Sequence, residues 1–192
     1  MIELKGPWKL GYSFDVYTTS SVFIGNNQWG HPLFDNTYSP MGKLVKDFKY
    51  GQEVSKLSNI LQLLIQDKDF NSYINNIDTI LPVVPSNKAR AFQPVYFLAN
   101  ALAEVYKKQL VIDAIESTNT EQIKGLDISE KYKKVKSSLI VKEDKLDKRS
   151  NILILDDVFD SGFTLQAYTD TLKEKGYNNI FIFTLTKTRV SD

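Results

Sequence analysis

The stretch "NILILDDVFDSGFTL", residues 151–165, decides the fold that we predict for this chain. A run of isoleucine and leucine leads directly into two adjacent carboxylates, Asp156 and Asp157. Small and hydroxyl residues follow, and then "TLQAYTDTLKEKG" (164–176), whose last residue is typical of a helix C-terminus. Because a continuous apolar run is typical of a strand buried on both faces, the stretch predicts a strand, a short loop and a helix.

Strands and helices alternate through the rest of the second half of the chain. The composition predicts strands at 78–85, 110–115, 137–141, 151–158 and 179–186, and helices at 94–109 and 164–176. Residues 116–136 are polar and rich in lysine, too polar to be core. We therefore predict an α/β fold, with a central parallel sheet and helices on both faces.

The first part of the chain has a different composition and predicts a small N-terminal hood. We assign the hood to residues 1–75 and the core to residues 76–192. "GYSFDVYTTSSVFIG" (11–25) has strand-like composition, "GNNQWGHPLFDN" (25–36) is typical of a loop, and residues 39–50 and 54–66 have helical spacing.

Composition and charge exclude several classes of protein. The chain has 192 residues, 42% of them hydrophobic, and a formal net charge of +1, which does not favour direct binding of nucleic acid. It has no cysteine, which excludes a disulfide framework and cysteine-ligated zinc. "MIELKGPWKL" (1–10) lacks the apolar core of a signal peptide, and no apolar run is long enough to cross a bilayer. We expect a cytoplasmic protein without a membrane partner.

The acid pair and the loop after it predict a ligand site. Asp156 and Asp157 are expected at the carboxyl end of a strand, the edge at which doubly wound sheets bind ligands. The helix N-terminus that follows favours a phosphate, and Gly162 allows the backbone to approach it. Two carboxylates suit a ribose diol or a hydrated Mg²⁺, so a sugar phosphate is indicated. In the alternative, the acids only end a strand and a hydroxyl only caps a helix.

"ILILDDVFDSGFT" (152–164) resembles the phosphoribosyl-pyrophosphate signature of type I phosphoribosyltransferases. The resemblance implies that Asp156 and Asp157 hold the ribose hydroxyls, and that Mg²⁺ is carried mainly by the pyrophosphate rather than by a direct protein ligand. It also implies a loop around the 5′-phosphate, made of Asp160, Ser161, Gly162, Phe163 and Thr164. The usual Thr-Thr-Gly of this loop is replaced here by Asp160-Ser161-Gly162.

Further segments resemble the ComF-type branch of this family. They are "GKLVKDFKYGQ" (42–52), "ILPVVPSNKARAFQPVYFLANALA" (80–103), "EQIKGLDISEKY" (121–132) and "TLTKTR" (184–189). The resemblance implies a pyrophosphate loop with Ser86, Asn87, Lys88 and Arg90, and a flexible loop with Lys124. The alternative for the proposed pyrophosphate loop is an ordinary solvated turn with exposed basic residues. ComF proteins often begin with a cysteine-rich zinc element, which this cysteine-free chain cannot form.

Three further residues are candidates for contact with the acceptor. Asp160 is placed as in hypoxanthine-guanine phosphoribosyltransferases, which implies a general base; the alternative is that it caps the helix. Lys187 follows the last strand, where purine-using members have a lysine that touches the base. His31 is the only histidine, and it is either a general base or simply exposed in an aromatic loop.

We therefore expect a phosphoribosyltransferase that moves the 5-phosphoribosyl group from Mg²⁺-phosphoribosyl pyrophosphate to a nitrogen acceptor and releases pyrophosphate. The alternative is a non-catalytic phosphoribosyl-pyrophosphate or nucleotide-binding module associated with DNA uptake or processing. The sequence does not choose the acceptor. A homodimer is consistent with the family resemblance, because dimers are common among its members.

Overall fold

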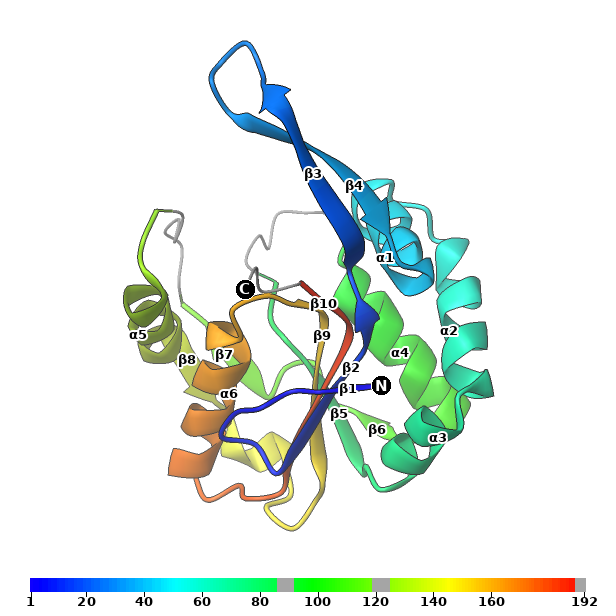
Figure 1. Cartoon of the computed structure of the whole chain (residues 1–192). Helices are drawn as coiled ribbons and strands as arrows, with labels where there is room; N and C mark the ends of the chain where they lie inside the picture. Colours follow the sequence, from blue (N-terminus) through cyan, green and yellow to red (C-terminus); the bar gives the residue numbers. More distant parts are fainter. Residues whose placement is uncertain (86–91, 119–124, 189–192) are drawn as a thin grey trace.

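The computed structural model describes residues 1–85, 92–118 and 125–188 (Figure 1). Six strands form one sheet in the order β1-β2-β10-β9-β5-β6. They are β1 (Ile2–Glu3), β2 (Leu10–Val16), β5 (Thr79–Pro82), β6 (Gln109–Leu110), β9 (Ile152–Phe159) and β10 (Ile180–Lys187). All neighbours pair in parallel except β1, which is antiparallel to β2. The predicted central parallel sheet is confirmed, with β1 as an antiparallel strand at its edge.

Helices cover both faces of this sheet (Figure 1). One face carries α1 (Pro40–Tyr50), α2 (Lys56–Gln66), α3 (Lys68–Asn75) and α4 (Pro94–Tyr106), and the other carries α5 (Ile128–Ser138) and α6 (Phe163–Glu174). The position of β9 between the two layers of helices explains why its sequence is apolar without alternation. Leu153 and Leu155 pack in the core under α1–α4, whereas Ile152 and Ile154 pack in the core under α6.

Several elements differ from the prediction made from the sequence pattern. Helix α5 and helix α3 occupy segments that the composition left without structure, and β4 (Pro32–Tyr38) lies where a loop was expected. The predicted strand at 110–115 is divided between β6 and β7 (Ile115–Ser117), which pairs with β8 (Leu139–Val141), and η1 (Glu143–Lys145) follows. Strand β4 pairs with β3 (Thr18–Asn26) in a separate two-stranded ribbon.

The central sheet crosses the predicted domain boundary at residue 75. Strands β1 and β2 belong to the six-stranded sheet, and α1, α2 and α3 contribute to the same apolar core as α4. The β3–β4 ribbon extends away from the layered body (Figure 1). Within residues 1–75, this ribbon is therefore the part that projects in the way expected of a hood.

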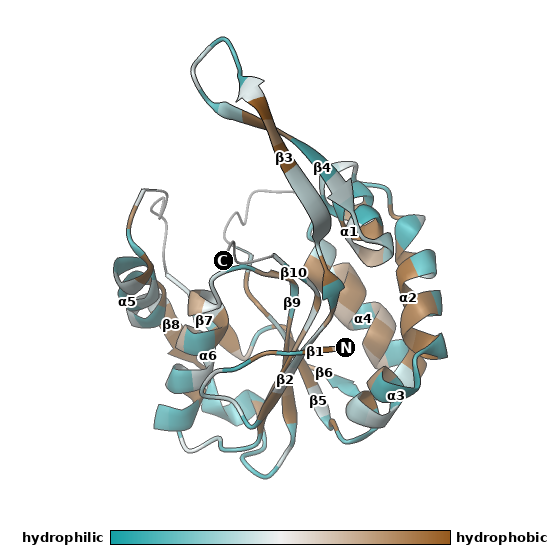
Figure 2. Ribbon diagram, viewed as in Figure 1, coloured by the Kyte–Doolittle hydropathy of each residue, from teal (hydrophilic) through white to brown (hydrophobic). Residues whose placement is uncertain are grey.

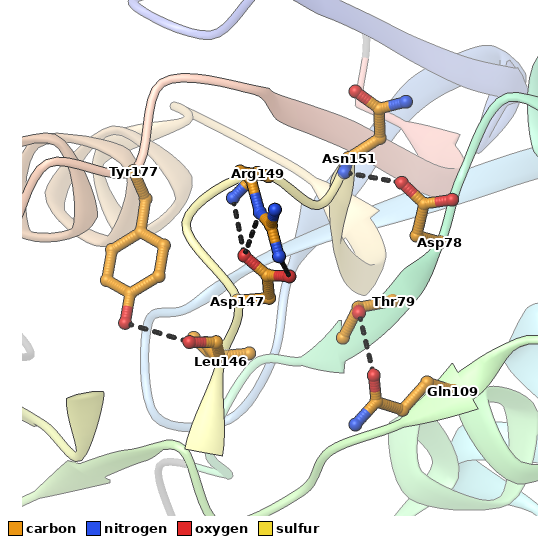
Figure 3. Close-up of polar contacts among 8 residues, drawn as sticks. All are labelled: Asp78, Thr79, Gln109, Leu146, Asp147, Arg149, Asn151 and Tyr177. Carbon is orange, nitrogen blue, oxygen red and sulfur yellow. Dashed lines mark hydrogen bonds and ion pairs between the residues drawn. The ribbon is translucent and has the colours of Figure 1, made fainter. Parts of the chain in front are cut away.

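Polar contacts hold the amino ends of the parallel strands in register (Figure 3). The backbone N–H of Asn151 donates to Asp78 Oδ2 at 2.8 Å, which ties the start of β9 to the start of β5. Thr79 Oγ1 lies 3.4 Å from Gln109 Oε1, next to the pairing of β5 with β6. The opposite edge of the sheet, where the strands end, carries the acids.

Candidate functional site

The two acids lie at the carboxyl end of β9, as predicted. Asp156 is paired in register with Thr184 of β10, and its Oδ1 accepts a hydrogen bond of 2.8 Å from the backbone N–H of Asp157. Asp157 is 6% exposed and Asp156 is half-buried. Successive side chains of a strand point to opposite faces, so the neighbouring carboxylates of Asp156 and Asp157 lie in two different environments.

Lys49, the next-to-last residue of α1, pairs with Asp157. Its Nζ lies 2.9 Å from Asp157 Oδ1, and the two side chains are 25% and 8% exposed. Burial lowers the pKa of Lys49, but the charge of Asp157 and their hydrogen bond outweigh it, so the pKa lies above its usual value. The lysine is therefore charged and offsets one carboxylate of the pair.

The second carboxylate, that of Asp156, has a pKa close to neutral pH. Burial and the adjacent charge of Asp157 raise the pKa of Asp156 from 3.8 to about 7. One lysine beside two acids leaves a net negative charge when both acids are ionised. A cation or a hydroxyl donor that enters the site would therefore favour the ionised form of Asp156.

Gly162 determines how the loop turns from β9 into α6. It is the N-cap of α6 with a φ of 75°, in the left-handed region that favours glycine, and the helix has no side-chain cap. A Cβ at this position would lie 2.6 Å from Cζ of Phe159. The helix thus begins with backbone N–H groups rather than a side-chain oxygen at its positive end, a typical anion-binding arrangement.

Asp160 has a partner just after the end of the neighbouring strand β10. Thr188 Oγ1 donates to Asp160 Oδ1 at 2.8 Å, and the Thr188 backbone N–H donates to the carbonyl of Phe159 at 2.8 Å. These two bonds fasten the loop to the end of β10. The alternative role of Asp160 as the helix cap is wrong, because Gly162 is the N-cap and α6 lacks a side-chain cap bond.

A cavity of about 260 Å³ joins the acids to the start of α6. It is lined by residues 83–85, 93–95 and 156–158, together with Lys49 and Thr164. Tyr168 of α6 secures one wall, since its hydroxyl accepts a hydrogen bond of 2.9 Å from the backbone N–H of Val84. Burial raises the pKa of Tyr168, which keeps this hydroxyl neutral.

A wider hollow, of about 690 Å³, lies at the opposite edge of the sheet. Lys9, Tyr73, Asn151 and Phe181 are among the residues that line it. Its tyrosine hydroxyl already donates to the Ile182 carbonyl, and its lysine contacts Asn179. The smaller cavity is the better candidate because it holds two carboxylates, a charged lysine and a helix start in one place.

Of the other predicted residues, those that the structure describes do not line this cavity. Lys187 is the last residue of β10, paired in register with Phe159, and it is not part of the cavity lining. His31 lies in the turn of the β3–β4 ribbon, exposed, with its backbone N–H bonded to Asn27 Oδ1. Ser86, Asn87, Lys88, Arg90 and Lys124 lie outside the described residues.

Lys49 is the site residue that the sequence reasoning did not select. It stands 108 positions from its partner Asp157, so no local spacing joins the two. The signal in the sequence is "GKLVKDFKYGQ", a helical segment that resembles the family but carries no pattern that links it to the acids.

Within residues 1–85, 92–118 and 125–188, no helix is long and apolar enough to span a membrane.

Comparison with solved structures gives several adenine phosphoribosyltransferases. One is 12% identical with a TM-score of 0.46, covering 89% of this chain and 86% of that chain. The enzyme from Saccharomyces cerevisiae, complexed with adenine and an imino-altritol bisphosphate, is 14% identical with a TM-score of 0.44, covering 87% and 83%. The enzyme from Thermoanaerobacter pseudethanolicus is 15% identical with a TM-score of 0.40, covering 87% and 95%.

Sequence comparison identifies the family. No curated protein matches the chain. The model of the phosphoribosyl transferase domain matches residues 53–191, which is more than half of the chain and includes the acid pair, the loop and α6. This match confirms the predicted fold class and enzyme class, and the chain therefore belongs to the phosphoribosyltransferase family.

Proposed function

We propose that this chain transfers a 5-phosphoribosyl group from phosphoribosyl pyrophosphate to a nitrogen acceptor and releases pyrophosphate. The observation that carries the proposal is the cavity that both the acid pair and Thr164 line. Asp156 and Asp157 accept hydrogen bonds from the ribose hydroxyls. The loop of residues 160–164 and the N-terminus of α6 hold the 5′-phosphate.

The charges of the site suit the bond changes of this reaction. The bond from ribose C1 to pyrophosphate oxygen breaks, a bond from C1 to the acceptor nitrogen forms, and the acceptor loses its N–H proton. The acids lie beside the ribose, where positive charge develops as the C1–O bond lengthens. The ion pair with Lys49 orients Asp157, so this stabilisation is in place before the substrate reacts.

Mg²⁺ fits the residues of this cavity. Carboxylate oxygens are the ligands that Mg²⁺ prefers, and a divalent cation would favour the ionised form of Asp156. When bound with the pyrophosphate, the ion neutralises charge on the leaving group. Asp156 and Asp157 are the residues of this chain that would face it, through its water ligands.

The acceptor side of the proposal rests on Asp160. An aspartate in this loop can take the proton of an N–H heterocycle, although its carboxylate is hydrogen-bonded to Thr188 in the structure. Lys187, one residue before this threonine, is the proposed contact to a base. The ComF-like segments make the ComF-type branch our proposed place within the family, and they leave the acceptor open.

A screen of acceptors with radiolabelled phosphoribosyl pyrophosphate tests the proposal. Purines, pyrimidines and simple amines are each incubated with the protein and Mg²⁺, and labelled product and pyrophosphate are measured together. The proposal predicts stoichiometric product and pyrophosphate with at least one acceptor. Tight binding without pyrophosphate release from any acceptor would favour a nucleotide-binding module instead.

A further inference from the structure

The ribbon formed by β3 and β4, residues 18–38, projects from the layered body and includes hydrophobic residues (Figure 2). We call this segment the arm. Its exposed apolar residues are Val22, Phe23, Ile24, Trp29, Leu33 and Phe34, with exposed fractions from 44% to 73%. A concentration of this kind on one short segment marks an interaction site rather than ordinary surface.

Both faces of the arm are apolar. Phe23 and Phe34 are paired in register, with ring centroids 5.8 Å apart, so they share one face. Val22 and Leu33, each adjacent to one of these phenylalanines along its strand, point to the other face. A partner that covered one face alone would leave the other in water.

The arm has a firm base but unsupported strands. Ser39 Oγ donates to the Val16 carbonyl at 2.5 Å and accepts from the Gly42 N–H at 2.9 Å, which fixes the root of the arm to the start of α1. Within the described part of the chain, β3 and β4 pair only with each other. Two-stranded ribbons are marginally stable alone, and each outer edge offers unpaired backbone groups to another strand.

The charge of the arm selects among partners. Residues 18–38 contain no lysine or arginine, and Asp35 is their only formally charged residue. The arm therefore lacks the cations with which proteins bind nucleic acid or an anionic membrane. Two identical arms, in contrast, meet almost without like-charge repulsion, which otherwise opposes self-association.

The exposed area also suits a pair of arms. Six half-exposed large side chains offer roughly 600 Å² on each arm, against about 800 Å² per partner in a standard interface. A two-fold contact buries the same patch on both copies and so uses this area twice. We propose that the arm is the interface with a second copy of this chain, in which the two ribbons cover each other's apolar faces.

The oligomeric state of the full chain tests this proposal, independently of the proposed catalysis. Sedimentation or light scattering from about 1 to about 100 μM should give a mass that rises to that of a dimer. Two double variants should each raise the dissociation constant of the dimer more than about tenfold. One combines Phe23→Ser with Phe34→Ser, and the other combines Val22→Ser with Leu33→Ser. These residues are outside both apolar cores, so the melting temperature of the body should be retained.

Ile128→Ser is the matched control, because Ile128 is 59% exposed and lies on α5 rather than on the arm. It should dimerise like the wild type. A wild type that stays monomeric throughout the concentration range would overturn the proposal, and so would a dimer unchanged in both double variants. A monomer that binds vesicles of phosphatidylcholine would also overturn it and assign the arm to a membrane surface.

Discussion

Lys49 Nζ lies 2.9 Å from Asp157 Oδ1 and joins the end of α1 to the end of β9. The contact gives the acid pair an unequal charge distribution, because the lysine offsets Asp157 while Asp156 has a pKa of about 7. The site therefore depends on a helix that lies far from the acids in the sequence. The first prediction concerns this lysine.

Replacing Lys49 with Met should weaken binding of Mg²⁺-phosphoribosyl pyrophosphate roughly five- to thirtyfold, or about 1–2 kcal/mol, because the pair is partly exposed. Because the charge of Lys49 lowers the pKa of Asp156, its loss should raise that pKa further, which moves the rise of affinity with pH to higher pH. Lys49→Arg should restore part of the affinity. Titration calorimetry at several pH values measures both effects.

Lys43→Met is the control for this variant. Lys43 lies on the same helix and is exposed, and the cavity lining does not include it. It should bind like the wild type across the pH range. If Lys49→Met and Lys43→Met have the same affinity and the same pH profile, Lys49 has no part in the site.

Asp156 should make the folded state less stable as the pH rises. Its pKa is about 7 when folded and 3.8 when unfolded, so the folded state binds more protons between these values. The stabilising contribution is complete below about pH 4 and is lost as the pH rises through about 7. Because Asp156 is half-buried, we expect about 1–3 kcal/mol over this window.

Asp156→Asn removes this titration while keeping the shape of the side chain. The free energy of unfolding, measured with denaturant at intervals from about pH 4.5 to pH 8, should fall with pH in the wild type more steeply than in the variant. The same slope in both proteins would show that Asp156 titrates as an ordinary surface acid.

Gly162→Ala should damage the phosphate loop. The φ of 75° is strained for alanine, and the new Cβ would lie 2.6 Å from the ring of Phe159, so the loop or the ring must shift. We expect a loss of roughly 1–2 kcal/mol in stability and a larger loss of affinity for phosphoribosyl pyrophosphate. Melting temperature and calorimetry together separate the two.

Gly176→Ala is the matched variant just beyond the other end of α6. Its φ of 87° carries the same backbone strain, but a Cβ there would meet no atom closer than 3.9 Å. It should lose similar backbone stability and keep its affinity. Equal affinities in the two alanine variants would remove the loop from ligand binding.

Asp160→Asn separates chemistry from structure at the loop. Asparagine can still accept the hydrogen bond from Thr188 through its amide oxygen, but it cannot take a proton. With an acceptor found by the screen, turnover should fall about 10²–10⁴-fold while the melting temperature is unchanged. Full turnover in this variant would exclude Asp160 as the general base.

The layered core and the acid pair could be predicted from sequence because their signals are local. Strand β9 is apolar on both faces, and the acids, loop and helix start follow it within a few positions. Helix α5 gave a weaker signal. Only Ser138 of that helix is buried, so the apolar period was faint, although Asp127 and Glu130 form a capping box.

Other features depend on contacts between distant segments. The pairing of Lys49 with Asp157 is created by packing α1 on the sheet, and no spacing within the sequence encodes it. Strand β4 contains Pro32, Asp35 and Asn36, a composition typical of a loop, and among the described residues it pairs with β3 alone. The pyrophosphate and flexible-loop residues stay predictions, since Ser86 to Arg90 and Lys124 lie outside the described residues.

The most direct test of the central claim is calorimetry of Mg²⁺-phosphoribosyl pyrophosphate with the wild type and with Asp156→Asn, Asp157→Asn and the double variant. Each lost charged hydrogen bond is worth about 1.5–3 kcal/mol, so each single variant should bind roughly ten- to a hundredfold more weakly. We predict clear binding by the wild type and none by the double variant. Absence of binding to the wild type at millimolar ligand, or equal affinity in all four proteins, would contradict the account.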